Sequence, residues 1–161
     1  MARLVTPASA KMSETPMPEP VHEPTPETGW SLNPQLAADT TPVGDLHLSR
    51  LLAIDEAVYP WLILVPRRSG IVEIADLGAD ATLLMNEIVR ISRLLKAVTG
   101  CDKINVGAIG NVVPQLHVHI VARRSDDPLW PKPVWGLVQP RKSDAETFTR
   151  FIAAIRDGAG I

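Results

Sequence analysis

The sequence predicts an α+β domain in which an antiparallel sheet of about five strands carries a central helix and a C-terminal helix. Three observations support this fold class. Strand-like segments occur in two pairs, a long helical periodicity separates the pairs, and a second helical periodicity ends the chain. Because the connections within each pair are short, we expect antiparallel strands with the helices packed against the sheet.

The first predicted pair of strands spans residues 45–55 and 61–68. Apolar side chains in the first strand follow an alternating or near-alternating pattern, which is typical of a half-buried strand. They are Leu46, Leu48, Leu51 and Ala53. The second strand, WLILVPRR, is a short and nearly continuous apolar run ended by Pro66, which is typical of a buried strand. The intervening EAVYP predicts a turn, so the two strands should form an antiparallel hairpin.

The clearest predicted helix spans residues 80–100. Its apolar side chains recur at spacings of four and three, which places them on one stripe of a helix. They are Leu84, Ile88, Ile91, Leu95 and Val98. Asp80 is the expected N-cap, and Gly100 is the expected C-terminal stop.

The rest of the chain predicts two more strands and a final helix. KINVGAIGN (103–111) begins as a strand and passes into a glycine-containing loop, and QLHVHIVAR (115–123) is the next strand. After a loop rich in Pro and Trp, a helix is expected over residues 143–158, with Ser143 and Glu146 in capping-box spacing. Its apolar face comprises Phe148, Phe151, Ile152 and Ile155.

The composition is that of an ordinary globular protein, with 45% apolar and 21% charged residues in a chain of 161. That length is sufficient for one domain with a hydrophobic core. The net charge of -2 argues against a large basic surface, so no nucleic-acid partner is expected. The single cysteine, Cys101, excludes a disulfide framework within one chain. No apolar run reaches the length of a membrane span and no secretory signal is recognised, so we expect a cytoplasmic protein without membrane contact.

Residues 1–30 differ from the rest of the chain. The stretch SETPMPEPVHEPTPETG repeats Pro, Glu and Thr and contains few apolar residues. Such a segment cannot bury enough surface to offset the entropy of ordering it. We therefore predict a disordered tail over residues 1–30 and one domain over residues 31–161.

Two groups of side chains flank the predicted strands. Arginines stand at strand ends, where such charges are usually solvated: Arg67, Arg68, Arg123 and Arg124. Trp130 and Trp135 follow the last strand, and we expect them to pack or to form a subunit contact more readily than to stack on a base.

A row of polar residues occupies alternate positions of the predicted strand 115–123. One face of that strand would hold Gln115, His117 and His119, and the other Leu116, Val118 and Ile120. Three interpretations remain open. The polar face is a solvated strand surface, or part of a zinc site with a third ligand such as His47 or Asp55, or a site of phosphate chemistry. In the last case one imidazole is the nucleophile and its neighbour holds phosphate oxygens.

The stretch Gln-Leu-His-Val-His-Ile-Val, from Gln115 to Val121, resembles the signature of the histidine triad (HIT) family, His-φ-His-φ-His-φ-φ with φ apolar. Upstream, LLAID and PWLILVPRR resemble the family's ribose-contact strand and its apolar strand ended by Pro and a basic residue. INVGAIGNVVPQ resembles the family's glycine-rich approach to the triad. The resemblance covers residues 36–140 in order, and it is strongest for the bacterial branch with Gln at the first triad position, followed by WP and VWG.

The resemblance implies a HIT-like fold and an enzyme, a nucleotide hydrolase or nucleotidyl transferase that works through a covalent nucleotidyl-histidine. His117, at the middle position, would be the nucleophile that attacks the α-phosphorus, and His119 would hold the phosphate oxygens. Asn105 and Asn111 match phosphate-side positions of the family, and Asp55 matches its ribose contact. The implied substrates are dinucleoside polyphosphates or nucleoside phosphoramidates, with no metal or other cofactor.

Gln115 stands where the family has its first triad histidine. An amide can orient a neighbour through hydrogen bonds but cannot titrate, so any proton transfer at this position is lost. The nucleophile is intact, and the predicted catalytic set is His117, His119 and Gln115. The alternative is a catalytically weak nucleotide-binding module. The resemblance also implies a homodimer.

Overall fold

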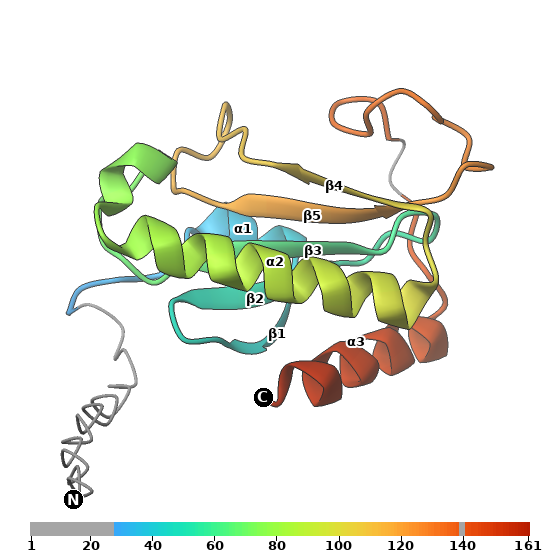
Figure 1. Ribbon diagram of the computed structural model, residues 1–161, viewed down its shortest axis with the longest axis horizontal. Helices are drawn as coiled ribbons and strands as arrows, with labels where there is room; N and C mark the ends of the chain where they lie inside the picture. The colour runs from blue at the N-terminus through green and yellow to red at the C-terminus, as the bar shows by residue number, and fades with distance from the viewer. Residues whose placement is uncertain (1–27, 139–140) are drawn as a thin grey trace, which may run out of the picture.

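A five-stranded antiparallel sheet forms the centre of the structure, so the predicted α+β fold class is confirmed. The computed structural model describes residues 28–138 and 141–161, and residues 1–27 of the predicted tail lie outside the described residues. In chain order the elements, shown in Figure 1, are α1 (Pro34–Asp39), β1 (Thr41–Asp45), β2 (Ser49–Ile54), β3 (Trp61–Pro66), the 3-10 helix η1 (Ile74–Leu77), α2 (Asp80–Thr99), β4 (Lys103–Gly107), β5 (Val118–Arg123) and α3 (Ala145–Ala159).

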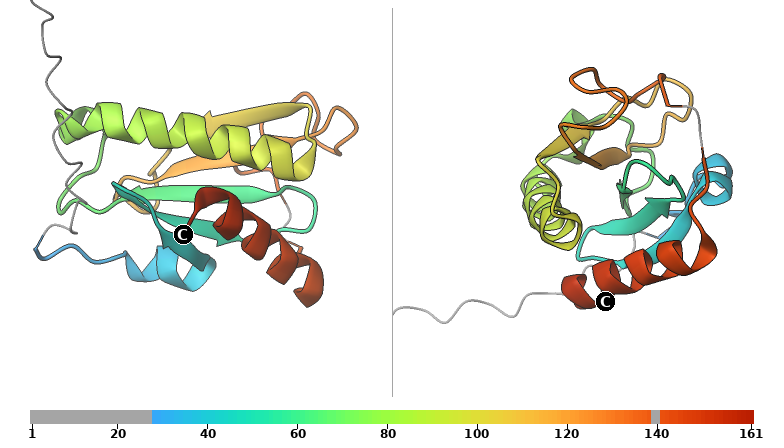
Figure 2. Two further views of the ribbon diagram at one scale, coloured as in Figure 1. Left: turned by 60° about the horizontal axis from the view of Figure 1, so that its bottom comes forward. Right: turned by 90° about the vertical axis from the view of Figure 1, so that its right-hand side faces the viewer.

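The sheet has the strand order β1-β2-β3-β5-β4 and separates two apolar layers. The helices α2 and α3 cover one face, and α1 lies on the opposite face (Figure 2). Side chains of β3 point alternately to the two faces of the sheet and contribute to both layers. Leu62 and Leu64 belong to the core under α2. Trp61 and Ile63 belong to the second core, together with Leu36 of α1. In the described part of the chain, no helix is both long and apolar enough to cross a membrane.

The predicted hairpin between the first two strands is confirmed as β2 and β3, which pair from Ser49 opposite Pro66 to Ile54 opposite Trp61. All six residues of β3 are buried, as its apolar run predicted. The prediction of one strand over residues 45–55 is wrong at its start, because β1 ends at Asp45 and β2 begins only at Ser49. The residues between them form the turn of a further hairpin that the sequence analysis did not predict.

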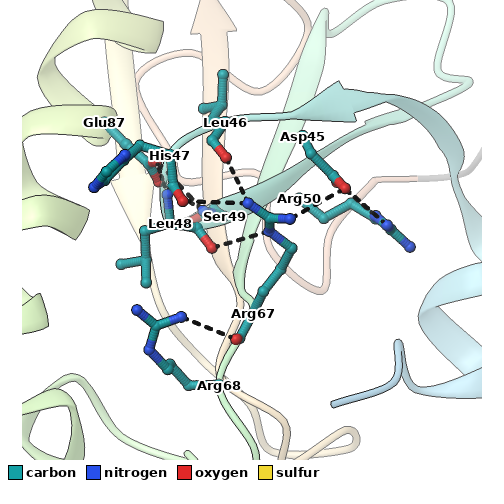
Figure 3. A network of polar contacts seen from close by, with 9 residues as sticks. All are labelled: Asp45, Leu46, His47, Leu48, Ser49, Arg50, Arg67, Arg68 and Glu87. Carbon is teal, nitrogen blue, oxygen red and sulfur yellow. Dashed lines mark hydrogen bonds and ion pairs between the residues drawn. The ribbon is translucent and has the colours of Figure 1, made fainter. Parts of the chain in front are cut away.

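Buried side chains from other elements hold this β1–β2 turn (Figure 3). Glu87 of α2 accepts hydrogen bonds from the backbone N–H groups of Leu48, at 2.6 Å, and Ser49, at 3.1 Å. Arg67 donates to the carbonyl of Leu46 at 2.8 Å and is itself buried rather than solvated, contrary to the expectation for a strand end. Because Glu87 lies 39 residues from Leu48, no local pattern could have predicted the turn.

Both predicted helices are confirmed, but their first residues differ from the predictions. Asp80 is the first residue of α2 rather than its N-cap, and its carboxylate pairs with Arg68 at 2.7 Å. The N-cap of α3 is Asp144 rather than Ser143, and its side chain accepts a hydrogen bond from the N–H of Thr147 at 3.0 Å. In each case the negative charge of an aspartate carboxylate stabilises the N-terminus of the helix, which is the positive end of the helix dipole.

Arg123, the last residue of β5, is fully buried instead of forming a solvated strand end. Its guanidinium donates two hydrogen bonds to the carboxylate of Asp127, at 2.8 and 2.9 Å. A third nitrogen donates to the side-chain oxygen of Asn105 and the carbonyl of Lys132, each at 3.0 Å. The ring of Trp130 lies over the same guanidinium, with its centre 5.8 Å away. Arg123 therefore anchors the loop that follows β5.

Replacing Arg123 with Met should lower the free energy of unfolding by about 3–5 kcal/mol, because the Asp127 carboxylate then stays buried without its partner. The matched control is Arg124→Met. Arg124 pairs with Asp126 at 3.1 Å, but the two side chains are 60% and 73% exposed, so its loss should cost less than about 1 kcal/mol. Urea denaturation of both variants measures the difference, and equal losses would show that Arg123 is not a buried anchor.

Candidate active site

Strand β5 carries only one of the three polar residues that were predicted to lie on it. It begins at Val118, so Gln115 and His117 lie in the segment that leads into the strand, and His119 lies within it. The alternation of burial nevertheless extends through both parts: the buried apolar residues are Leu116, Val118 and Ile120. His117 is only 7% exposed, so the interpretation of a solvated strand surface is wrong for this residue.

The protonation of His117 follows from its backbone partner. Its Nδ1 lies 2.7 Å from the carbonyl oxygen of Gln115. Because a carbonyl oxygen can only accept a hydrogen bond, Nδ1 must carry a proton. In the neutral ring the free lone pair is then on Nε2, which is the atom available to act as a nucleophile.

His119 has the opposite arrangement. The indole N–H of Trp61 donates a hydrogen bond to its Nδ1 at 3.0 Å, and an indole nitrogen can only donate. The neutral ring of His119 therefore carries its proton on Nε2. Burial, together with repulsion from His117, lowers the pKa of His119 from 6.5 to about 4. The ring is consequently neutral at pH 7 and offers an N–H donor on Nε2.

The two imidazoles are neighbours with complementary chemistry. Their ring centres lie 5.0 Å apart and the ring planes are inclined at 74°. His117 presents a lone pair and His119 presents an N–H group. A lone pair can attack an electrophilic centre, and an N–H donor can stabilise the negative charge on an oxygen bound to that centre. The pair is therefore suited to substitution at phosphorus.

Both histidines line a cavity of about 620 Å³ on the α1 side of the sheet. This volume is within the range of about 300–1,000 Å³ that is usual for small-molecule sites. Much of its wall is aliphatic: Leu36, Ile54, Ile63, Ile109, Val112 and Val113. Its polar side chains, besides the histidines, are Gln35, Asp39, Thr40 and Asn111. A largely apolar wall with a few polar groups is typical of a ligand-binding cavity.

The cavity brings together three of the six predicted site residues, namely His117, His119 and Asn111. Gln115 is not among the described lining residues. Its side-chain amide is instead hydrogen-bonded to the backbone of residues 31 and 33, and only its backbone carbonyl contacts a catalytic candidate.

Asn105 and Asp55 do not line the cavity among the described residues. The side-chain oxygen of Asn105 accepts a hydrogen bond from the buried Arg123 at 3.0 Å. The carboxylate of Asp55 accepts one from the backbone N–H of Ser143 at 2.9 Å. The phosphate and ribose contacts that the family resemblance implies for these two residues stay predictions.

The zinc interpretation required a third ligand beside His117 and His119. In residues 28–138 and 141–161, no group of three or more His, Cys, Asp or Glu side chains is arranged to hold a metal ion. Of the two candidates from the sequence, His47 lies in the β1–β2 turn (Figure 3) and Asp55 lies beside the start of α3.

Sequence reasoning did not assign three side chains that belong to the cavity. Trp61 sets the protonation of His119, but its position in an apolar run marked it only as a core residue. Asp39 was missed because the short helix that carries it was not predicted, although Asn33 at its N-cap and Pro34 at its first position are a sequence signal for a helix start. Trp135 lines the cavity as well as packing on Gly107, where an added Cβ would lie 3.0 Å from its ring. The sequence analysis named Trp135 but expected it to pack or to form a subunit contact rather than to face a ligand.

Comparisons with known proteins found one family model and several solved structures that are similar to this chain. The family model described as HIT domain matches residues 35–126. A histidine triad protein from Bradyrhizobium japonicum is 54% identical over 81% of this chain and 98% of its own, with a TM-score of 0.78. Histidine triad proteins from Sinorhizobium meliloti and Marinobacter aquaeolei are 41% and 39% identical, each over 81% of this chain and over 98% and 96% of their own, both with a TM-score of 0.78. No curated protein matched the chain.

The stability of the protein should fall between pH 6.5 and pH 4 because of His119. Its folded pKa of about 4 lies below the ordinary value of 6.5, so in this window the unfolded chain binds a proton that the folded chain does not. The loss is absent above pH 6.5, and at pH 4 it reaches at most about 3 kcal/mol.

Denaturation curves of the wild type and of His119→Asn at several pH values measure this contribution. We expect the wild type to lose more stability than the variant as the pH falls from 7 to 4. A difference between the two proteins that stays constant with pH would contradict the lowered pKa of His119.

Proposed function

We propose a function from one premise: the chain belongs to the HIT domain family. Membership supports a nucleotide-binding role or a hydrolase or transferase role. We infer the more specific activity of a nucleotide hydrolase or nucleotidyl transferase that forms a nucleotidyl-histidine intermediate. The observation that carries this inference is the opposite protonation of the two neighbouring imidazoles.

In the proposed reaction, the Nε2 lone pair of His117 attacks the α-phosphorus of the bound nucleotide. A phosphorus–nitrogen bond forms, the bond from phosphorus to the leaving group breaks, and the leaving group departs with the electron pair. Water or another acceptor then attacks the same phosphorus and forms a phosphorus–oxygen bond. The phosphorus–nitrogen bond breaks with its electron pair returning to Nε2, the proton of the attacking group passes to solvent, and the nucleotide and neutral His117 are released. One difficult displacement is thereby divided into two easier ones.

Neighbouring groups stabilise the charges that develop in each step. The ring of His117 becomes positive as its bond to phosphorus forms, and the Gln115 carbonyl that already accepts its Nδ1–H stabilises that charge. The Nε2–H of His119 donates to a non-bridging phosphate oxygen. Asn111 contributes an amide from the wall of the same cavity. Gln115 would thus act in the chemistry through its backbone rather than through its side chain.

The aliphatic wall of the cavity would hold the nucleobase, and Asp39 would meet the ribose hydroxyls. Asp39 is the only acidic side chain among the described lining residues, and a carboxylate accepts hydrogen bonds from paired hydroxyl groups. Each carboxylate already accepts one hydrogen bond, Asp39 from the side chain of Gln35 at 2.8 Å and Asp55 from the backbone of Ser143 at 2.9 Å, but Asp55, the ribose contact implied by the family resemblance, lies outside that wall. Asp39 is therefore the better-placed candidate.

The charge of the cavity favours one of the two substrate types. Among the described residues, no Lys or Arg lines it. A dinucleoside polyphosphate carries several negative charges, which neutral donors compensate poorly in a site of low dielectric constant. A nucleoside phosphoramidate has a single phosphoryl group, which His117 can attack while His119 and Asn111 donate hydrogen bonds to its oxygens. We therefore favour phosphoramidates.

We also propose the bacterial branch with Gln at the first triad position, one functional domain over residues 31–161, and a homodimer. The apolar side chains of Met85 and Val89 are 55% and 40% exposed on α2, which supports an interface on that helix.

His117→Asn tests the intermediate. The wild type, incubated with a nucleoside phosphoramidate and quenched in base, should show a covalent nucleotidyl adduct by intact-mass spectrometry. His117→Asn should show none, and its kcat should fall at least about 10³-fold because the nucleophile is gone. His47→Asn is the matched control, because His47 lies in the β1–β2 turn and not at the cavity (Figure 3), and it should keep the adduct.

The alternative function, a catalytically weak nucleotide-binding module, gives a different result in the same experiment. Tight binding of nucleotides without turnover or adduct, across both phosphoramidates and dinucleoside polyphosphates, would support the module and contradict the enzyme.

A further inference from the structure

The side chain of Gln115 bonds to a distant segment of the chain. Its Oε1 accepts a hydrogen bond from the backbone N–H of Asn33 at 2.8 Å, and its Nε2 donates to the carbonyl of Ser31 at 2.9 Å. The amide thus binds on both sides of Leu32, in the way that a backbone residue of a neighbouring parallel strand would. Both polar atoms of the side chain are used in this contact.

The segment held by Gln115 leads directly into α1. Asn33 is the N-cap of that helix, and its side chain accepts a hydrogen bond from the N–H of Gln35 at 2.9 Å. A helix of six residues is too short to be stable alone, so its position depends on contacts with the rest of the protein. Gln35, Leu36 and Asp39 of α1 line the cavity. The contact at Gln115 therefore positions one wall of the site.

A second contact secures the start of the same segment. The guanidinium of Arg50 lies over the ring of Trp30, 5.1 Å from its centre, and Arg50 is itself paired with Asp45 at 2.7 Å. Residues 30–33 are thus attached to β2 at one point and to the segment before β5 at another.

The first triad histidine of the family could not make the contact that Gln115 makes. The oxygen and nitrogen of a side-chain amide diverge from one carbon and can face the same segment, whereas the two nitrogens of an imidazole point away from each other. The backbone carbonyl of Gln115 meanwhile accepts from His117, as it would in any residue. The substitution therefore changes what holds the N-terminal segment and leaves the nucleophile's backbone partner in place.

We propose that Gln115 is a positioning residue that clamps residues 31–33, so that α1 closes one wall of the nucleotide cavity. The inference rests on the proposed function and deepens it, because it assigns part of the substrate affinity to the N-terminal segment.

Asn33→Pro tests the clamp without altering Gln115. The substitution removes the backbone N–H that donates to the side chain of Gln115. Because φ at Asn33 is -54°, a value that proline adopts, the backbone itself need not change. Asn33→Ala is the matched control, because it removes the same capping side chain and keeps the N–H. We expect the KM for a nucleoside phosphoramidate to be about five- to tenfold higher in Asn33→Pro than in Asn33→Ala, with kcat within about twofold. Gln115→Met, which keeps the length and loses both bonds, should show a similar rise in KM.

Gln115→His separates the clamp from triad chemistry. It should raise KM as Gln115→Met does and should not increase kcat. An increase in kcat with unchanged KM would overturn the proposal, and so would equal KM values for Asn33→Pro and Asn33→Ala.

Hydrogen exchange gives a readout that does not depend on turnover. Amides of residues 35–39 should exchange faster in Asn33→Pro and Gln115→Met than in Asn33→Ala, while those of the sheet do not change. Unchanged exchange in the two variants would overturn the clamp. A wild type that neither turns over nor binds nucleotides, yet shows the expected exchange, would contradict the proposed function alone.

Discussion

The position of β5 between β3 and β4 is the constraint on which the site depends. Val118 and Ile120 are buried in the core under α2, and this fixes His119 on the opposite face of the strand. There it is paired across the sheet with Ile63 and Gly107, and it lies within reach of Trp61. A shift of one residue in this register would exchange the two faces and bury both imidazoles in the larger core. The register of β5 that buries Val118 and Ile120 in the core is therefore also the register that places His119 at the cavity.

The two histidines of the site have different hydrogen-bonding properties although their side chains are the same. In each ring one nitrogen is hydrogen-bonded to a partner that can only accept or only donate. A backbone carbonyl forces a proton onto one ring, and the indole of Trp61 excludes a proton from the same atom of the other. The side-chain amide of Gln115 cannot titrate, so in the proposed reaction the proton for the leaving group would come from the substrate or from solvent.

Local periodicity was sufficient to predict the helices α2 and α3, the β2–β3 hairpin and the face of the sheet on which the histidines lie, because burial follows the short-range pattern of apolar residues. It could not predict the side-chain hydrogen-bond partners of His119 and Gln115, because these partners are distant in the sequence. Trp61 lies 58 residues from His119, and Gln115 bonds to residues 82 and 84 positions away. The β1–β2 turn was missed for the same reason, since the distant side chain of Glu87 stabilises it. Helix α1 was missed because six residues are too few to show a helical periodicity, although Asn33 and Pro34 mark its start.

Nitrogen-15 chemical shifts of the histidine rings at pH 7 distinguish the two tautomers of each imidazole. We expect His117 to carry its proton on Nδ1 and His119 to carry its proton on Nε2, and we expect Trp61→Phe to release only the second preference. Finding both rings in the same tautomer, or His119 protonated on Nδ1, would contradict this assignment.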